Sequence, residues 1–246
     1  MLNTDGFIWT SAARTDVGKV RKVNEDAVLD NSPAGLWVVA DGMGGHAAGD
    51  VASTAIVNSL AQVKASADAN ALVSEIEQRL MDVNADLVRQ SSERKDRQTM
   101  GSTVAVMLAF NKHCFVLWVG DSRIYRVRNG KLKRLFSDHS KVQDLVDEGL
   151  ITEEESERHP EANVITRAVG AGRQLYVDID MSEIEAGDRF MLCSDGLYKE
   201  VMESEMQALI SKGTPEEACN TLIELALERG SRDNVTVIVT QADSPR

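Results

Sequence analysis

The chain has 246 residues, 43% of them hydrophobic, and its 39 acidic and 27 basic side chains leave a formal net charge of −12. This length and composition predict an ordinary globular protein of one large domain or two small ones. A strongly acidic surface repels polyanions, so we expect neither nucleic acid nor an anionic membrane surface as a partner.

The first half of the chain predicts one strand followed by two helices. An apolar run at residues 36–40 indicates a short buried strand, and a helix is expected from about Ala48. The apolar face of that helix is expected to hold Val51, Ala52, Ala55, Ile56, Leu60 and Val63. A second helical pattern covers residues 71–88 and places Leu72, Ile76, Leu80, Val83 and Leu87 on one face. The polar segment 89–99 is expected to be a loop.

Three strand patterns follow with no helix between them, at residues 102–110, 113–120 and 123–135. Asn129-Gly130 within the third pattern is a type I′ hairpin signal. Strands joined this directly are expected to be antiparallel, because a parallel pair needs a crossover of about a dozen residues or more. Residues 140–170 are mixed and charged, and we expect a surface insertion with short helices there.

The remaining elements are strands at residues 174–184 and 188–196, helices at 203–212 and 214–229, and a strand at 234–241. No repeat or Pro-rich linker divides the chain. We therefore predict one α+β domain over residues 1–246, in which two antiparallel sheets pack on each other with helices outside.

Three cysteines stand far apart and form no Cys-x-x-Cys pair: Cys114, Cys193 and Cys219. This pattern indicates neither a disulfide framework nor a thiolate zinc site, and it favours a reducing compartment. Residues 1–15 lack the regions of a secretory signal, and no apolar run approaches the ~20 residues that span a bilayer. We expect a cytoplasmic protein, and we take it to be a monomer.

Residues 36–53 allow two chemical interpretations. From Gly42 they read as G-x-G-x-x-A, close to the fingerprint of a dinucleotide-binding turn. Asp41 would, however, set a carboxylate beside the pyrophosphate, and no acidic residue ends a second strand about 20 positions on. The sequence therefore favours Asp41 as the functional group, with the glycines as the backbone that lets water and ions approach it.

Acidic residues also stand at the ends of other predicted strands. Asp41, Asp121 and Asp195 each follow an apolar strand, and Asp233 precedes one. If these carboxylates meet, their repulsion demands protonation or a multivalent cation. Oxygen ligands without histidine or cysteine favour Mg²⁺ or Mn²⁺ over zinc. Two such ions about 3.5–4 Å apart would generate a hydroxide nucleophile and orient a phosphoryl group.

Eight segments in a fixed order carry a resemblance to a known family. They are TDVGKVRKVNEDA, VVADGMGGHAAGDVAS, GSTVAV, WVGDSRIYRVRNGKL, SDHS, NVITRAVG, FMLCSDGLYKEV and RDNVTVIV, from about Thr15 to Val239. The sequence resembles bacterial members of the PPM family of metal-dependent serine/threonine protein phosphatases. Eight ordered matches over nearly the whole chain make the resemblance specific, whereas any one of them alone is weak.

The resemblance implies an αββα sandwich with metal ions in a cleft at one end of the sheets. Asp41 would bridge two ions of Mn²⁺ or Mg²⁺, and the Gly42 carbonyl would be a further ligand. Asp195 and Asp233 would complete the shell of the first ion.

Further roles are implied for residues around these ligands. Asp26 would hold waters of the second ion, with Glu25 and Asn234 supporting the ligands. Asp121 would share a weaker third ion with Asp195. Arg21, four residues before Glu25, matches the arginine that grips the substrate phosphate, and residues of about 140–170 match a variable flap beside the cleft.

The proton donor to the leaving seryl oxygen has two candidates. In the animal form of the family a histidine follows Asp-Gly directly, whereas here Met43-Gly44-Gly45 intervene before His46. The alternative is an acidic water on a third ion held by Asp121, and we favour Asp121.

The leading hypothesis is hydrolysis of phosphoserine and phosphothreonine on proteins, with metal-bound hydroxide attacking phosphorus in line. The partners would be a cognate bacterial serine/threonine kinase and its substrates. A catalytically silent phosphoprotein-binding regulator on the same fold is the alternative. It is disfavoured because the metal positions Asp26, Asp41, Asp121, Asp195 and Asp233 are all acidic. Hydrolysis of a small phosphorylated metabolite would need a closed pocket, which the predicted flap does not suggest.

Overall fold

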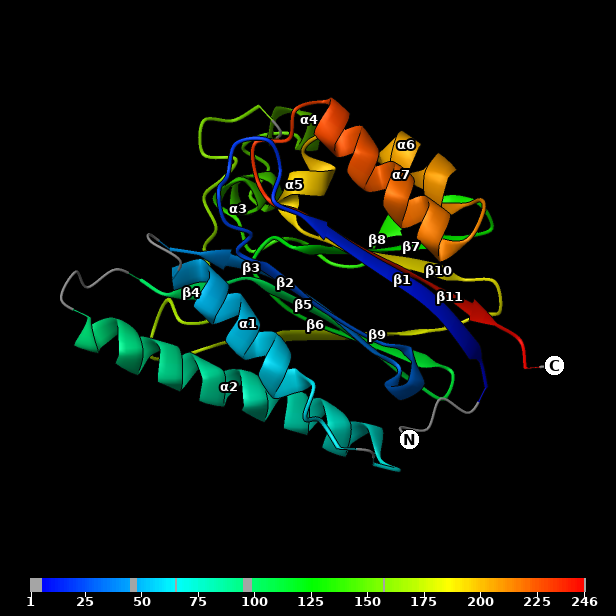
Figure 1. The fold of residues 1–246 in the computed structure, drawn as a ribbon, viewed down its shortest axis with the longest axis horizontal. Coiled ribbons are helices and arrows are strands. Elements are labelled where there is room, and N and C mark those ends of the chain that lie inside the picture. Colours follow the sequence, from blue (N-terminus) through cyan, green and yellow to red (C-terminus); the bar gives the residue numbers. More distant parts are fainter. Residues whose placement is uncertain (1–5, 45–47, 65, 95–98, 157, 246) are drawn as a thin grey trace.

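Two antiparallel sheets pack face to face, with helices on both outer faces (Figure 1). The computed structural model describes residues 6–44, 48–64, 66–94, 99–156 and 158–245. Every strand pair in these ranges is antiparallel, which confirms the predicted α+β sandwich and excludes a doubly wound parallel sheet.

The first sheet has the order β1 (Ile8–Asp16), β11 (Val235–Asp243), β10 (Arg189–Cys193), β7 (Arg123–Arg128), β8 (Lys131–Arg134). The second has the order β2 (Asp26–Asn31), β3 (Leu36–Met43), β5 (Val104–Phe110), β6 (His113–Val119), β9 (Asp178–Glu183), and β4 (Gly101–Ser102) pairs with β3. Helices α1 (Ala48–Leu60) and α2 (Ala69–Glu93) cover the second sheet, and α6 (Glu203–Ile210) and α7 (Pro215–Glu228) cover the first (Figure 1). The short elements are a 3₁₀ turn (Ser32–Ala34), α3 (Lys141–Asp147), α4 (Glu153–Ser156) and α5 (Asp195–Tyr198).

Strand β3 explains why its sequence reads as a continuous apolar run. Trp37 and Val39 point between the sheets, where they join the cluster that includes Phe190 and Ile238. Leu36 and Val38 point to the opposite face and pack in the cluster under α1 and α2. A strand buried on both faces needs apolar side chains at every position.

The hairpin between β7 and β8 is confirmed, since Asn129 has φ 52° and Gly130 has φ 71°. Positive φ at both central residues is the requirement of a type I′ turn. Because Gly130 has no neighbouring heavy atom within 4 Å of the position of a Cβ, the glycine serves the backbone conformation alone.

The helix predictions need three corrections. Residues 89–93 were expected to be a loop but continue α2. Their polar side chains are exposed or half-exposed, so they are compatible with helical backbone hydrogen bonding. Val51 is 43% exposed and therefore does not share the buried face of α1. Val63 lies beyond the end of α1 at Leu60.

Two features of the sheets were not predicted. Strands β1 and β2 have mixed, half-exposed side chains, and their apolar pattern is weak. The successive strands β6 and β7 do not pair, because β6 lies in one sheet and β7 in the other. The chain passes between the sheets at Gly120, where φ is +104°, and this crossing leaves Asp121 at the end of the sandwich.

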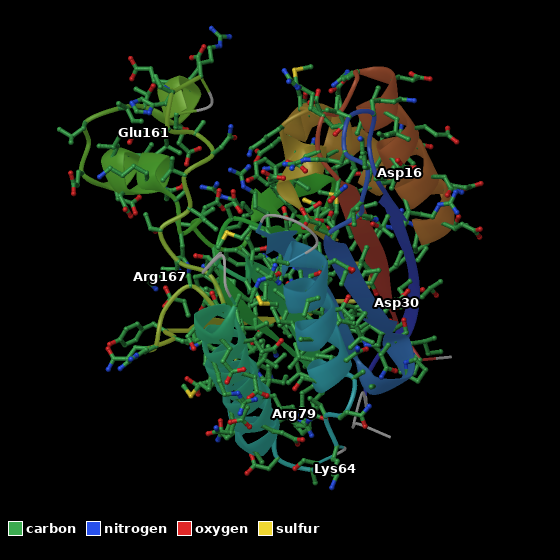
Figure 2. All side chains as sticks on the ribbon, turned by 60° about the vertical axis from the view of Figure 1, so that its left-hand side comes forward. Asp16, Asp30, Lys64, Arg79, Glu161 and Arg167 are labelled. Atoms are coloured by element: carbon green, nitrogen blue, oxygen red, sulfur yellow. The ribbon has the colours of Figure 1, made fainter. Side chains whose placement is uncertain are left out.

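Residues 140–170 leave the sheets as a separate excursion that carries α3 and α4 (Figure 2). Glu161 lies in its outer loop, and Arg167 lies where the chain returns toward β9 (Figure 2). Arg167 donates from Nη1 to Asp178 Oδ1 of β9 over 3.0 Å. Among the described residues, no helix combines the length and the apolar character that crossing a membrane requires.

Candidate metal centre

The acids predicted from strand ends converge on one cleft, of about 750 Å³, at the end of the sandwich where β3, β6 and β10 finish. The acidic side chains that line the cleft are Glu25, Asp41, Asp121, Asp195 and Asp233. The cleft is also lined by basic residues, among them Arg21, which was predicted, and Lys199, which was not. His46 lies outside the described residues, so its prediction stays untested.

Asp41 lies on β3 directly opposite Asp26 on β2. Thr103 fixes the backbone of Asp41 on both sides: its Oγ1 accepts from Asp41 N over 3.2 Å, and its N donates to Asp41 O over 2.9 Å. The Thr103 hydroxyl also lies 2.7 Å from that of Ser122. The strand carrying Asp41 and the crossing that carries Asp121 are thereby linked.

Asp26 is 8% exposed and ties the two sheets together. Its Oδ2 accepts from Ser194 Oγ over 2.8 Å and from Thr236 Oγ1 over 2.7 Å. Asp26 belongs to the second sheet, whereas Ser194 follows β10 and Thr236 lies on β11 of the first sheet. Its other oxygen, Oδ1, is buried and has no hydrogen-bond partner, and the same holds for Oδ1 of Asp195. A buried carboxylate oxygen without a donor is costly unless a cation or proton satisfies it.

Burial and mutual repulsion keep these carboxyls from ionising together. Burial raises the pKa of Asp26 to about 7. The hydrogen bonds from Thr236 and Ser194 lower this pKa, and the charges of Asp195 and Asp233 raise it further. Burial and Asp195 raise the pKa of Asp121 to about 7. Burial, followed by the charges of all four other aspartates, raises the pKa of Asp41 well above its ordinary value. A multivalent cation would remove this conflict.

The glycines beside Asp41 serve the close approach of three backbone segments. A Cβ on Gly42 would lie 2.2 Å from the Gly49 carbonyl oxygen and 2.5 Å from that of Glu25. Gly42 N donates to Glu25 O over 3.1 Å, and Gly49 N donates to Glu25 Oε1 over 3.2 Å. These contacts hold Glu25 against the start of α1, at the wall of the cleft.

Asn234 fastens the loop that precedes Glu25. Its Oδ1 accepts from Glu25 N over 2.8 Å, and its Nδ2 donates to Val17 O over 2.9 Å and to Val23 O over 3.0 Å. Arg21 lies in this loop, and its guanidinium pairs with Asp233 at 2.8 Å. Asn234 thus holds both ends of the loop that carries Arg21, and its role toward the metal ligands stays a prediction.

Asp121 is held by residues that the sequence interpretation did not single out. Tyr198 donates from its hydroxyl to Asp121 Oδ2 over 3.3 Å. The Arg123 guanidinium lies 3.6 Å from the centre of the Tyr198 ring, and Asp138 accepts from it with both carboxylate oxygens. Tyr198 and Asp138 stand in the quoted segments FMLCSDGLYKEV and SDHS, which are the signal that could have drawn attention to them.

The donor set fits hard divalent ions. It consists of carboxylates, two of which keep an unpartnered buried oxygen, with no cysteine among the cleft residues. Within the described ranges, no three acidic, histidine or cysteine side chains are drawn together around one point as they stand. In this structure Lys199 pairs with Asp195 at 2.5 Å, and Arg21 pairs with Asp233 at 2.8 Å. The cations that now compensate the acids would have to give way to ions.

The raised pKa values predict that the metal-free protein loses stability as pH rises. Between the ordinary pKa of 3.8 and about 7, folded Asp26 and Asp121 bind protons that the unfolded chain has released. A folded state that binds more protons is disfavoured by raising the pH. In thermal unfolding with excess chelator, the midpoint should fall by several degrees between about pH 5 and about pH 8. The fall should shrink in Asp121→Asn, and a midpoint independent of pH would contradict the assignment.

Comparisons with known proteins point in one direction. A family model described as protein phosphatase 2C matches residues 19–225. The serine/threonine protein phosphatase PstP of Mycobacterium tuberculosis is 39% identical over 228 residues, covering 93% of this chain but only 44% of the relative. The serine/threonine phosphatase stp of Listeria monocytogenes is 36% identical over 240 residues, and the match covers 94% of this chain and 94% of the relative.

A solved structure agrees with the sequence relatives. The catalytic domain of PstP in complex with two manganese ions superposes with a TM-score of 0.87 at 36% identity. The match covers 97% of this chain and all of that one. The likeness therefore extends over the whole sandwich, including the end at which the acids converge.

Proposed function

The chain belongs to the protein phosphatase 2C family, and from that premise we propose that it hydrolyses phosphoserine and phosphothreonine in proteins. The observation that carries the proposal is the convergence of Asp26, Asp41, Asp121, Asp195 and Asp233 at one end of the sandwich. A silent phosphoprotein-binding regulator would not need to retain so costly a concentration of buried and half-buried carboxyls. The two manganese ions in the similar catalytic domain of PstP, together with the oxygen ligands of this cleft, favour Mn²⁺ or Mg²⁺ as the cofactor.

The residues fall into proposed ligand roles. Asp41, central to the cluster, would bridge two ions, with the carbonyl of Gly42 beside it. Asp195 and Asp233 would complete the shell of one ion, and Asp26 would support the other through its free oxygen. When bound, such ions activate water and offset the charge of phosphoryl oxygens.

The protein's own side chains prepare the site for a phosphate. Ser194 and Thr236 clamp Asp26, so this carboxylate is already oriented before a ligand arrives. Thr103 holds the backbone of Asp41 through its N and O, which fixes the position of this residue in β3. Preorganised groups cost less reorganisation in the transition state, which is where they contribute to rate.

The substrate is proposed to be a protein. The rim residues Arg21 and Asp233 are 51% and 42% exposed, so the cleft opens to the surface and admits a phosphorylated side chain on a larger molecule. The flap residues Asn163 and Ile165 form another part of the lining, where residues next to the phosphorylated one would lie. A small metabolite would gain little from so open a site.

A panel of substrates tests this assignment. The Mn²⁺-loaded protein should hydrolyse phosphothreonine and phosphoserine peptides and should leave sugar phosphates and nucleotides largely intact. Tight binding of the phosphopeptides without turnover would favour the silent regulator. Comparable turnover of a small metabolite would overturn the protein substrate.

The biological setting completes the proposal. A cognate serine/threonine kinase and its substrates are the proposed partners, and the chain is proposed to act as a monomer with residues 1–246 as one catalytic domain. Three buried, unpaired cysteines agree with a reducing cytoplasm. A phosphoproteome of cells with and without the protein should identify the affected kinase and its targets.

Arg21 is proposed to grip the substrate phosphate. Its guanidinium pairs with Asp233 but is half exposed, so it can turn toward a phosphate in the cleft and donate two parallel hydrogen bonds. Arg21→Ala should lower kcat/KM by roughly 10–100-fold, in line with the loss of a charge-assisted pair. Bound manganese should be unchanged, and Arg21→Lys should restore little because lysine lacks the planar fork.

The control for Arg21 is Arg14→Ala, which removes the same charge from β1. Arg14 is exposed and is not among the residues that line the cleft. Unchanged kcat/KM in Arg21→Ala, with manganese content intact, would refute the assignment.

A further inference from the structure

Arg232 is an exposed cation in the wall of the cleft. It stands between Ser231 and Asp233, and all three residues line the cleft. Arg21, by contrast, has its charge met by Asp233 at 2.8 Å. Within the ranges that the structure describes, Arg232 makes neither an ion pair nor a side-chain hydrogen bond. No described residue therefore neutralises its charge.

The backbone on both sides of Arg232 is fixed. Ser231 is buried, and its carbonyl oxygen accepts from Lys19 N over 2.9 Å. On the other side, Asn234 N donates to Asp233 Oδ1 over 2.9 Å. A cation on a fixed segment loses less conformational freedom on meeting a ligand than one on a freely moving loop.

The loop beside this segment presents an apolar side chain and further positive charge. A Cβ on Gly18 would lie 2.1 Å from the Asp233 carbonyl oxygen, so the loop and the segment are in direct contact. Val20 lines the cleft and is 58% exposed. Lys19 and Lys22 are exposed too, and neither pairs with an acid among the described residues. This wall of the cleft is therefore apolar and positive where it meets solvent.

Uncompensated positive charge stands out in a chain whose formal net charge is −12. The other cations that line the cleft have acidic partners, since Arg21 pairs with Asp233 and Lys199 with Asp195. A guanidinium without such a partner at the mouth of a cleft attracts anionic groups of an approaching molecule. Carboxylates match it best, because they can accept two parallel hydrogen bonds from it.

We propose that Arg232 selects substrates that carry an acidic residue close to the phosphorylated one, by pairing with the carboxylate at the mouth of the cleft. The inference rests on the proposed function and deepens it by naming the class of sequence around the phosphorylated residue. A phosphate gripped by Arg21 fixes the peptide at one point. Its neighbouring side chains then lie along the wall that Val20 and Arg232 form.

Two phosphothreonine peptides that differ only in flanking Glu or Gln residues test the inference. With the Mn²⁺-loaded chain at low ionic strength, kcat/KM should be roughly two- to fivefold higher for the Glu peptide, as one exposed ion pair gives. The preference should shrink as salt screens the charges. Arg232→Gln should bring the ratio of the two kcat/KM values close to one. The metal centre is common to both peptides, so its contribution cancels in this ratio.

Charge reversal gives a result that a merely structural role would not produce. Arg232→Glu should make the Glu peptide the poorer substrate and should favour a third peptide with flanking Lys residues. Lys131→Glu is the matched control, because it changes the net charge equally on β8, at an exposed residue that does not line the cleft. It should keep the preference for the Glu peptide.

Binding without turnover separates this inference from the proposed function. Phosphonate analogues of the Glu and Gln peptides resist hydrolysis, and fluorescence anisotropy with Mn²⁺ present should give the lower Kd for the Glu analogue. A chain that hydrolyses neither peptide, yet binds the Glu analogue more tightly and loses this difference in Arg232→Gln, would defeat the proposed function. It would retain the role of Arg232.

Equal kcat/KM for the Glu and Gln peptides in the unaltered chain at low ionic strength would overturn the inference. Equal losses on both peptides in Arg232→Gln would overturn it too, because the arginine would then act on the phosphate that they share. Both results leave the proposed function standing, since the two peptides are still hydrolysed.

Discussion

Asp41→Ala is expected to lower turnover of a phosphothreonine peptide by roughly a thousandfold or more, since the charge stabilisation lost is several kcal/mol. Asp41 is the carboxyl whose pKa is raised by each of the other four aspartates of the cluster. Asp41 is therefore the residue that we propose would hold both ions. Steady-state kinetics and manganese content, measured on the same preparation, check this result.

Loss of the fold must be separated from loss of the site. Asp41→Asn keeps the shape of the side chain and removes an ionisable group that the neighbouring aspartates repel, so the metal-free variant should unfold at a higher temperature than the unaltered chain at neutral pH. Asp180→Ala, an exposed acid on β9, serves as the control and should retain full activity. Full activity in Asp41→Ala would exclude the bridging role.

Asp121→Ala is expected to show a loss that depends on the leaving group. Turnover of a phosphoserine peptide, whose alkoxide leaving group needs a proton, should fall by about 10²–10⁴-fold. An aryl phosphate has a far better leaving group, so its hydrolysis should fall much less. Asp121 is suited to this task because it lines the cleft together with Asp195, where the two carboxylates would hold the third ion whose bound water supplies the proton.

The alternative donor, His46, gives the opposite result. If His46 supplies the proton, His46→Ala should show the selective loss and Asp121→Ala should not. Equal losses on both substrates in both variants would remove both residues from the role. Tyr198→Phe, which deletes the hydroxyl that donates to Asp121 Oδ2, should shift selectivity in the same direction as Asp121→Ala but less.

The convergence of the acids was predictable because strand ends are local features. Asp41, Asp121 and Asp195 each follow an apolar run, and antiparallel strands in a sandwich bring such ends to a shared edge. The type I′ turn was predictable for the same reason, because Asn129 and Gly130 specify their own backbone. Ordered family segments added the fold and the reaction class.

The features of the site that the sequence did not predict depend on contacts between segments that are distant along the chain. Asp26 is clamped by Ser194 and Thr236, which lie 168 and 210 positions away along the chain. Lys199 reaches Asn163 across 36 positions. No local pattern specifies such partners, since each side chain alone is typical of an exposed position.

Edge position and sheet crossing explain the strand errors. Strand β1 pairs with β11 alone, and its outward side chains are free to be polar, so the apolar alternation is lost. The short link between β6 and β7 led us to expect an antiparallel pair, but at Gly120 the chain passes into the other sheet. A glycine that allows positive φ does not by itself show which sheet receives the next strand.

Metal dependence of peptide hydrolysis tests the central claim most directly. The metal-stripped protein should release no phosphate from a phosphothreonine peptide in excess chelator. Adding Mn²⁺ beyond the chelator should restore release, with activity rising as the tight ions bind. Undiminished hydrolysis in excess chelator, with metal shown to be absent, would contradict the account.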